Sequence, residues 1–299
     1  MRREFIQASG KPENKRDKAF RAQVEAAARK NAPESQAPSA ELYRPCLEAF
    51  PYEWLNGVFR YIHDRSRVPT EFRDLIQGTE GVQLKELETE MGSYAQMINV
   101  VKLDPTRMEN KIPAAVELGL DAAFTRQLLL TRVLIHEAVH AYSKTLCSGV
   151  ELFRKQKEGT FVVESGLEKR TFVKSGADGE VVLQSAGGRA LNEGLVDILA
   201  DDIFREYLSM QGLTNSAETS KFLAFYEQRA DPYREYRIDV AEIADSIAAD
   251  RGVDMRTVIQ AFIQQLSAEG PLSEELKAWI EELGANVFFK GKESSSTAS

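Results

Sequence analysis

Apolar residues recur at helical spacing along most of the chain, and this pattern predicts a largely helical protein. Two short helices are expected between residues 41 and 67, with a break at Pro51. A long helix is expected from about 121 to 146, and another from about 189 to 208. Further helices are expected at roughly 217–229, 233–250, 254–267 and 273–284.

Two stretches have the β-branched and aromatic content that is typical of strands. Residues 92–105, GSYAQMINVVKLDP, predict a strand that ends at Asp-Pro. Between about 160 and 185, the runs TFVVES, RTFVKS and EVVLQS are separated by turn sequences and predict a β-meander. The expected fold class is therefore α+β, mostly helical, with a small mixed or antiparallel sheet and an inserted β-meander.

The two ends of the chain lack the pattern of a folded domain. Residues 1–40 are basic and poor in large apolar side chains, and NAPESQAPSA (31–40) has the composition of a linker. We expect a flexible basic N-terminal tail over 1–40, a folded domain over 41–288 and a disordered tail over 289–299. The alternative for the N-terminal tail is a targeting or partner-binding arm.

Charge and composition narrow the class of protein. The 299-residue chain carries a net charge of -8, which argues against nucleic acid as a partner. No run approaches 18 apolar residues and the N-terminus lacks the apolar core of a signal peptide, so we expect no membrane span and a cytoplasmic protein as synthesised. Export by a specialised route would leave no such mark. Cys46 and Cys147 are too few for a disulfide framework and are expected to be buried thiols, with a single bridge between them as the alternative.

Two of the three histidines lie in the apolar stretch LLLTRVLIHEAVHAYS, residues 128–143. On a helix, His136 and His140 share one face about one turn apart, so both imidazoles can bind one Zn²⁺ ion. Glu137 projects about 100° away from His136 and can reach a metal-activated water without ligating the ion. The alternative is a helix that carries two histidines by chance. Three polar side chains in so apolar a helix would then still need partners to be buried.

A zinc ion held by two histidines needs a third protein ligand, with the fourth position left for water. The metzincin extension requires a glycine and a histidine where this chain has Ser143 and Leu146. His63, the remaining histidine, lies in the polar stretch RYIHDRSR, where an exposed or locally bonded side chain is expected. The third ligand is therefore expected to be a carboxylate.

The stretch RALNEGLVDILADDIF offers this carboxylate. Glu193 follows a Gly-Gly turn near the start of a predicted helix and could ligate the ion. Asp197, one turn further on the same face, could accept the N–H of a ligand imidazole and so fix its tautomer. The alternative is an amphipathic helix with an acidic face, which Asp201 and Asp202 would extend.

HEAVH (136–140) followed by NEGLVD (192–197) resembles the gluzincin class of zinc metallopeptidases, in which the Glu and the Asp keep this four-residue offset. The resemblance implies a zincin-like fold for residues 41–288 and a peptide or protein substrate. The residues that match the family are the zinc ligands His136, His140 and Glu193, the general base Glu137, and Asp197 as the carboxylate bonded to a ligand histidine.

In gluzincins, a strand before the active-site helix lines the cleft and pairs with the substrate backbone. GSYAQMINVV (92–101) is similar in position and character. The resemblance therefore implies that substrate contacts Gly92, Ser93, Tyr94 and Ala95.

The family stabilises the tetrahedral oxyanion with a further histidine or with a tyrosine, and no histidine follows His140 in this chain. The stretch ADPYREYRIDVAEIADSI offers Tyr233 and Tyr236, with Arg234 and Arg237 close by, and both tyrosine hydroxyls and arginines can donate to an oxyanion. Tyr236 is favoured for this role. The alternative is a tyrosine half-buried at a helix–helix contact.

About fifty residues separate His140 from Glu193, and the meander predicted there could roof or narrow the cleft. The expected function is zinc-dependent peptide-bond hydrolysis with Glu137 as general base. The alternatives are an inactive zincin-fold binding or structural module, and a metalloprotease effector or toxin exported by a specialised secretion system. The sequence does not indicate an oligomeric state.

Overall fold

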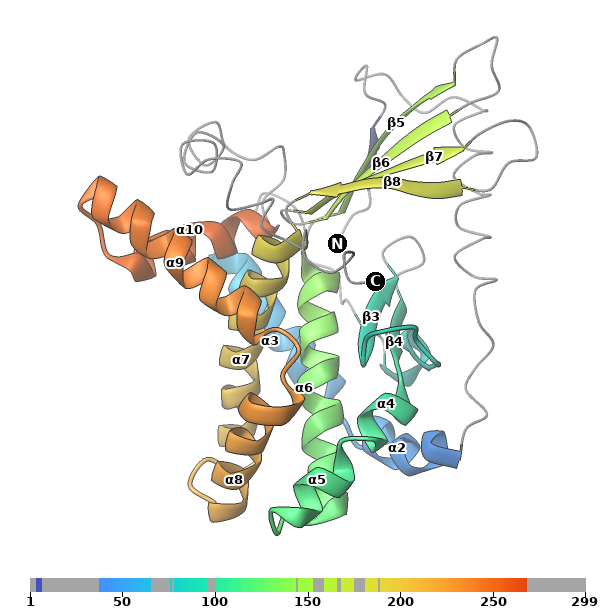
Figure 1. Cartoon of the computed structure of the whole chain (residues 1–299), viewed down its shortest axis with the longest axis vertical. Coiled ribbons are helices and arrows are strands. Elements are labelled where there is room, and N and C mark those ends of the chain that lie inside the picture. The colour runs from blue at the N-terminus through green and yellow to red at the C-terminus, as the bar shows by residue number, and fades with distance from the viewer. Residues whose placement is uncertain are drawn as a thin grey trace, which may run out of the picture.

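The computed structural model describes residues 4–6, 38–65, 76, 78–95, 100–143, 145–152, 159–165, 168–174, 181–187 and 189–267. Figure 1 shows its helices and strands. The helices are α2 (Pro38–Glu48), α3 (Tyr52–Arg65), α4 (Pro105–Glu109), α5 (Ile112–Glu117), α6 (Ala122–Tyr142), α7 (Arg189–Met210), α8 (Ala217–Phe225), α9 (Arg234–Arg251) and α10 (Met255–Ser267). The described residues also form a short 3-10 helix, η1 (Gly78–Gly81), and a π-helical turn, η2 (Tyr226–Ala230).

The strands form two separate sheets. One has three strands in the order β2-β4-β3, and the other has five in the order β1-β5-β6-β7-β8. The bounds are β1 (Glu4–Ile6), β2 (Val82–Leu84), β3 (Gly92–Ala95), β4 (Val100–Leu103), β5 (Thr145–Leu152), β6 (Gly159–Ser165), β7 (Glu168–Lys174) and β8 (Val181–Gly187). The described part is thus mostly helical with a small mixed sheet, which agrees with the predicted α+β class.

Helix α6 is the central element (Figure 1). Asp121 caps its start, because its carboxylate accepts the Phe124 amide at 2.8 Å. Every side chain from Leu128 to Ser143 is buried, since α2, α5, α7 and the three-stranded sheet all pack against this helix. The helix ends at Tyr142 and not at 146 as predicted, because the following residues from Thr145 pair with β6.

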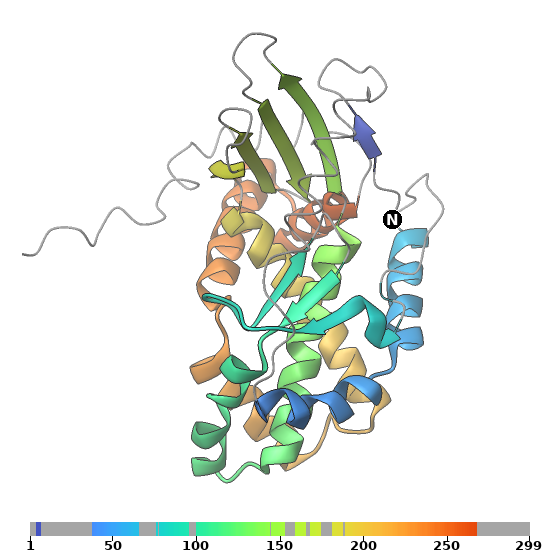
Figure 2. The same cartoon turned by 90° about the vertical axis from the view of Figure 1, so that its right-hand side faces the viewer.

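The three-stranded sheet covers one side of α6 (Figure 2). Strand β4 pairs in parallel with β2 and antiparallel with β3. The single strand predicted over 92–105 is therefore wrong, since its two ends form β3 and β4, which pair with each other. Among the described strands of this sheet, β4 alone has neighbours on both sides, so β3 lies at its edge in the part of the chain that the structure describes.

The predicted meander is confirmed as β6, β7 and β8, which pair antiparallel in sequence. Two strands that the sequence did not predict extend its sheet. Strand β5 pairs antiparallel with β6, and β1, which lies within the predicted tail, pairs in parallel with β5. Figures 1 and 2 place this sheet beyond the C-terminal end of α6.

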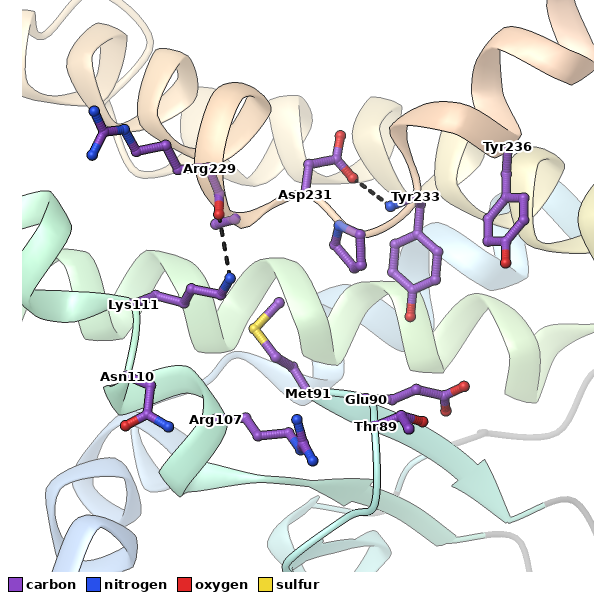
Figure 3. Close-up of a pocket in the computed structure, with 12 residues that line it drawn as sticks. Thr89, Glu90, Met91, Arg107, Asn110, Lys111, Arg229, Asp231, Tyr233 and Tyr236 are labelled. Carbon is purple, nitrogen blue, oxygen red and sulfur yellow. Dashed lines mark hydrogen bonds between the residues drawn. The ribbon is translucent and has the colours of Figure 1, made fainter. Parts of the chain in front are cut away.

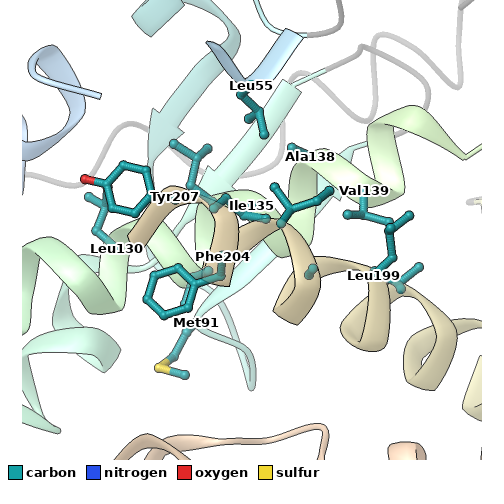
Figure 4. Close-up of a cluster of buried hydrophobic side chains, with 14 of the residues drawn as sticks. Leu55, Met91, Leu130, Ile135, Ala138, Val139, Leu199, Phe204 and Tyr207 are labelled. Atoms are coloured by element: carbon teal, nitrogen blue, oxygen red, sulfur yellow. The ribbon is translucent and has the colours of Figure 1, made fainter. Parts of the chain in front are cut away.

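The core is formed by one cluster of buried apolar side chains. Figure 4 shows part of it, where Ile135 and Val139 of α6 lie beside Leu199 and Phe204 of α7. Among the described helices, none has both the length and the apolar composition needed to cross a membrane. Cys46 is a half-buried free thiol whose pKa is raised by burial; the Cys147 side chain lies outside the described ones.

The helix boundaries agree with the predictions in most places. The break at Pro51 separates α2 from α3, and α2 begins at Pro38, before the start near 41 that the sequence predicted for the first of these two helices. Helix α8 stops at Phe225, and the chain continues in the π-helical turn η2 to Ala230. The helix predicted at 273–284, most of the predicted N-terminal tail and the C-terminal tail lie outside the described residues.

Candidate metal centre

His136 and His140 lie one turn apart on α6 and face the same side, as the spacing predicts. Their ring centroids are 5.0 Å apart and the ring planes meet at 70°. Both side chains are buried, with exposed fractions of 1% for His136 and 7% for His140. Two buried imidazoles on one helix face need polar partners from another element.

Glu193 of α7 supplies that partner. Its Oε2 lies 3.2 Å from Nε2 of His140 and 3.4 Å from Nε2 of His136. The three ligand atoms all lie within 4.8 Å of one another, and this is the one such group of metal-binding side chains in the part of the chain that the structure describes. The predicted trio is therefore brought together, and it could hold a metal ion. His63 of α3 is not part of the group; its side chain is buried, so of the two expected positions, exposed or locally bonded, the exposed one is wrong.

Asp197 holds the ring of His136 from the other side. Its Oδ1 lies 3.0 Å from Nδ1 of His136, so the neutral imidazole can donate there and leave the lone pair of Nε2 toward Glu193. Burial opposes the charged form of Asp197. Even so, the charge of Arg132 and the bond to His136 hold the pKa of Asp197 well below its usual range. The carboxylate is thus ionised and keeps His136 oriented.

Arg132 is a residue of this centre that was not predicted from the sequence. It lies one turn before His136 on α6, is 1% exposed, and donates from Nη2 to Oδ1 of Asp197 at 2.6 Å. Its guanidinium also lies over the ring of Tyr226, 5.3 Å from the centroid. The signal was present in the run LLLTRVLI, because an arginine inside an apolar helix requires a buried counter-charge.

Arg237 joins the same charge network from α9. It donates from Nη1 to Oδ2 of Asp197, and from Nη2 to Oδ2 of Asp231 at 2.5 Å. Arg237 is one of the two arginines expected near the oxyanion, but its guanidinium faces these two carboxylates. Arg234, the other arginine considered, is exposed. Two arginines therefore fix Asp197, and Asp197 fixes His136.

Glu137 is 2% exposed and lies between the two histidines and the edge of the three-stranded sheet. The backbone amide of Tyr94 donates to its carboxylate. Burial, helped by the nearby charges of Glu193 and Glu90, raises the pKa of Glu137 to about 8. Such a carboxyl group is suited to exchange a proton near neutral pH.

Strand β3 lies directly beside Glu137. A Cβ added to Gly92 would meet Cγ1 of Val133 at 2.6 Å and Oε1 of Glu137 at 2.7 Å, so only glycine allows this approach. Backbone groups of residues i and i+2 face the same edge of a strand. The Tyr94 amide faces Glu137, so the open edge of β3 faces the candidate centre. The carbonyl oxygen of Met91 accepts the Asp104 amide at 2.8 Å, so the backbone groups of the alternate residues, Ser93 and Ala95, face β4.

Tyr233 and Tyr236 take different positions, although both come from the start of α9. The ring of Tyr233 stacks on the imidazole of His136, with centroids 3.9 Å apart and planes at 14°. Burial and the charges of Glu137 and Glu193 raise its pKa well above the ordinary value. The ring of Tyr236 is 6.5 Å from that of Tyr233 and does not stack on His136.

Gly194 allows this segment to approach the centre. A Cβ at this position would collide with the carbonyl oxygen of Tyr236 and would lie 2.5 Å from Cγ2 of Val240. The glycine of NEGLVD thus lets α9 pack closely on α7, one residue after Glu193. This contact holds Tyr233 against the ligand histidine.

Comparisons with known proteins do not assign the chain. No protein-family model matches it, and searches of curated proteins and of solved structures find no significant match. The function of the protein is therefore inferred from the residues of the candidate metal centre.

Proposed function

We propose that the protein is a zinc-dependent peptidase of the gluzincin type, with a zincin-like fold. The observation that carries this proposal is the buried group of His136, His140 and Glu193, with Glu137 beside it at the open edge of β3. A pair of histidines, a glutamate ligand and an adjacent glutamate are the groups that such hydrolysis requires.

The spacing of the ligand atoms is compatible with a zinc ion between them. Ligands 2.0–2.1 Å from a tetrahedral zinc ion lie about 3.3–3.4 Å from each other. The two imidazole-to-carboxylate distances, 3.2 and 3.4 Å, agree with this value. One carboxylate and two imidazoles also match the ligand types that zinc accepts, and Asp197 supports His136 as carboxylates commonly do in zinc sites.

When bound, zinc would polarise the scissile carbonyl and make a water molecule more acidic. Glu137 would accept the proton of the attacking water and deliver it to the leaving amine. Its raised pKa suits this exchange, although a cation held nearby would lower that pKa. The Tyr94 amide would keep the carboxylate oriented between the ligands and the substrate.

Tyr233 is the residue that we assign to the oxyanion. Its phenol remains protonated because burial and two neighbouring carboxylates oppose ionisation. It can therefore donate a hydrogen bond to the negative charge that develops on the carbonyl oxygen. Its stacking on His136 places it nearer the ligands than Tyr236, which the sequence favoured.

The substrate would bind in an extended form along β3. An edge strand can pair with a peptide backbone, and the open edge of β3 faces Glu137. Gly92, Ser93, Tyr94 and Ala95 would then contact the substrate, as the resemblance implies.

The test is hydrolysis of a peptide library by the zinc-loaded full chain and by Glu137→Gln. We expect the variant to retain zinc and to lose at least about 100-fold in kcat/KM, because the proton acceptor is removed. Glu117→Gln, which alters an exposed carboxylate on α5, is the matched control and should behave like wild type. Equal hydrolysis by wild type and Glu137→Gln would contradict the proposal.

A further inference from the structure

Tyr233 forms part of the wall of a pocket of about 440 Å³ (Figure 3). Its walls come from three segments that are distant in sequence. They are the connection before β3, the turn after α4, and the segment that joins η2 to α9. Tyr233 lines this pocket and also stacks on His136, so the pocket adjoins the candidate metal centre.

The two ends of the pocket differ in charge. Glu90 lies at the end nearer the centre, where its charge contributes to the raised pKa of Glu137. Asp231 is already paired, because its carboxylate binds Arg237 at 2.5 Å and accepts the Tyr233 amide at 2.8 Å. Arg107 and Lys111 lie at the other end, on the side of α4 (Figure 3).

Arg107 and Lys111 lie on one face of the α4 segment. The chain stays in the right-handed helical conformation through Asn110 and Lys111, so residues four apart project to the same side. Arg107 is held by the carbonyl oxygens of Leu87 and Glu88, and its charge is partly offset by Asp104 at 3.4 Å.

Lys111 is the less compensated of the two cations. Its Nζ donates to the carbonyl oxygen of Arg229 at 3.3 Å, and it pairs with no carboxylate within the described part of the chain. Figure 3 shows the Arg229 side chain extending away from Lys111, so only the backbone of Arg229 faces the ammonium group. A neutral carbonyl leaves the positive charge available to an anionic ligand group.

We propose that this pocket binds a carboxylate of the peptide substrate, with Lys111 as the residue that pairs with it. The inference rests on the proposed function, and it makes the protein selective for acidic peptides or for a free C-terminus. The net charge of -8 would repel acidic peptides from the chain as a whole. A preference for them therefore has to come from a local site.

The test compares matched peptides on the zinc-loaded full chain. A library places Glu or its neutral isostere Gln at each position around the cleaved bond, and a second pair has a free or an amidated C-terminus. We expect one carboxylate to raise kcat/KM about tenfold or more over its neutral match, as for a charge-assisted hydrogen bond. The position of that carboxylate distinguishes a side chain from the C-terminus.

Variants of Lys111 test whether this residue causes the preference in kcat/KM for a peptide carboxylate. Lys111→Met should abolish the ratio of acidic to neutral kcat/KM, Lys111→Arg should retain it, and Lys111→Glu should reverse it in favour of Lys-containing peptides. Lys221→Met removes the same charge from an exposed position outside the pocket lining and should leave the ratio unchanged. A wild-type enzyme that cleaves peptides with no preference for a carboxylate, or with a preference for Lys, would overturn the inference and leave the proposed function standing.

A binding measurement separates the two proposals if no peptide is cleaved. Fluorescent acidic and neutral peptides are titrated into zinc-loaded Glu137→Gln, with and without Lys111→Met, and anisotropy is followed. Tighter binding of the acidic peptide that is lost with Lys111→Met supports the pocket even when hydrolysis fails. Equal binding of both peptides contradicts it.

Discussion

Arg132 and Asp197 form an ion pair that is closed to solvent, with Nη2 and Oδ1 2.6 Å apart and side-chain exposures of 1% and 0%. The pair joins the helix that carries the two histidines to the helix that carries Glu193. Because Asp197 also binds His136, the geometry of the centre depends on a charge pair inside the core.

Asp197→Asn should destabilise the protein by about 3–5 kcal/mol, because it removes the charged carboxylate to which the buried Arg132 donates. The measurement is urea unfolding in the presence of a chelator, so that metal binding does not contribute. Glu41→Gln is the control, since Glu41 pairs with Arg44 at 2.9 Å on the surface and its loss should cost less than about 1 kcal/mol. An equal decrease in the free energy of unfolding for the two variants would show that the buried ion pair stabilises the protein no more than the surface pair does.

Gly194→Ala should destabilise the protein by about 1–3 kcal/mol, because the new methyl group collides with the Tyr236 carbonyl and with Val240. It should also lower kcat, since the start of α9 carries Tyr233. Gly57→Ala on α3 is the control, because its Cβ meets nothing within 4 Å. That change should stabilise the helix by about 0.5–1 kcal/mol. A stable Gly194→Ala protein with normal kcat would refute the close contact between α7 and α9.

Tyr233→Phe should lower kcat about 100-fold and leave zinc affinity unchanged, because it removes the hydroxyl donor and keeps the ring stacked on His136. Steady-state kinetics and a zinc competition assay measure the two quantities. Tyr236→Phe should have a smaller effect on kcat. A larger loss in Tyr236→Phe would return the oxyanion role to the residue that the sequence favoured.

Glu109 and Arg126 give a dependence of stability on pH. Arg126 donates to both carboxylate oxygens of Glu109 at 2.7 and 2.8 Å, and this bond lowers the pKa of Glu109. A lowered folded-state pKa stabilises the protein above the unfolded-state pKa, and the gain is lost as the pH falls through the folded-state pKa. Glu109→Gln should thus cost about 1 kcal/mol at pH 7 and progressively less below about pH 4. A cost that is independent of pH would contradict this account.

The ligand set could be predicted from sequence because helical periodicity determines it locally. His136 and His140 are four residues apart on one helix, and Glu193 and Asp197 are four apart on another, so each pair shares a face whatever the fold. The way in which the helices pack against each other could not be predicted from the sequence. The Arg132–Asp197 pair and the stacking of Tyr233 on His136 both depend on that packing.

The strands were harder to predict, because pairing partners are distant in sequence. The stretch 92–105 has strand-forming residues throughout, and nothing in its alternation shows where β3 ends and β4 begins. The pairing of Glu4–Ile6 with β5 joins residues about 140 positions apart, which no local pattern can indicate. Residues 143–146 were assigned to the helix because their composition does not distinguish helix from strand.

If His136, His140 and Glu193 hold one zinc ion, the metal content of the purified protein measures this directly. Full-length protein is loaded with zinc, separated from free metal and analysed by mass spectrometry, with circular dichroism to verify folding. We predict one zinc per chain in wild type and in Glu137→Gln, and none in His140→Ala or Glu193→Gln. Wild-type protein without zinc, or a folded His140→Ala that retains one ion per chain, would contradict the claim.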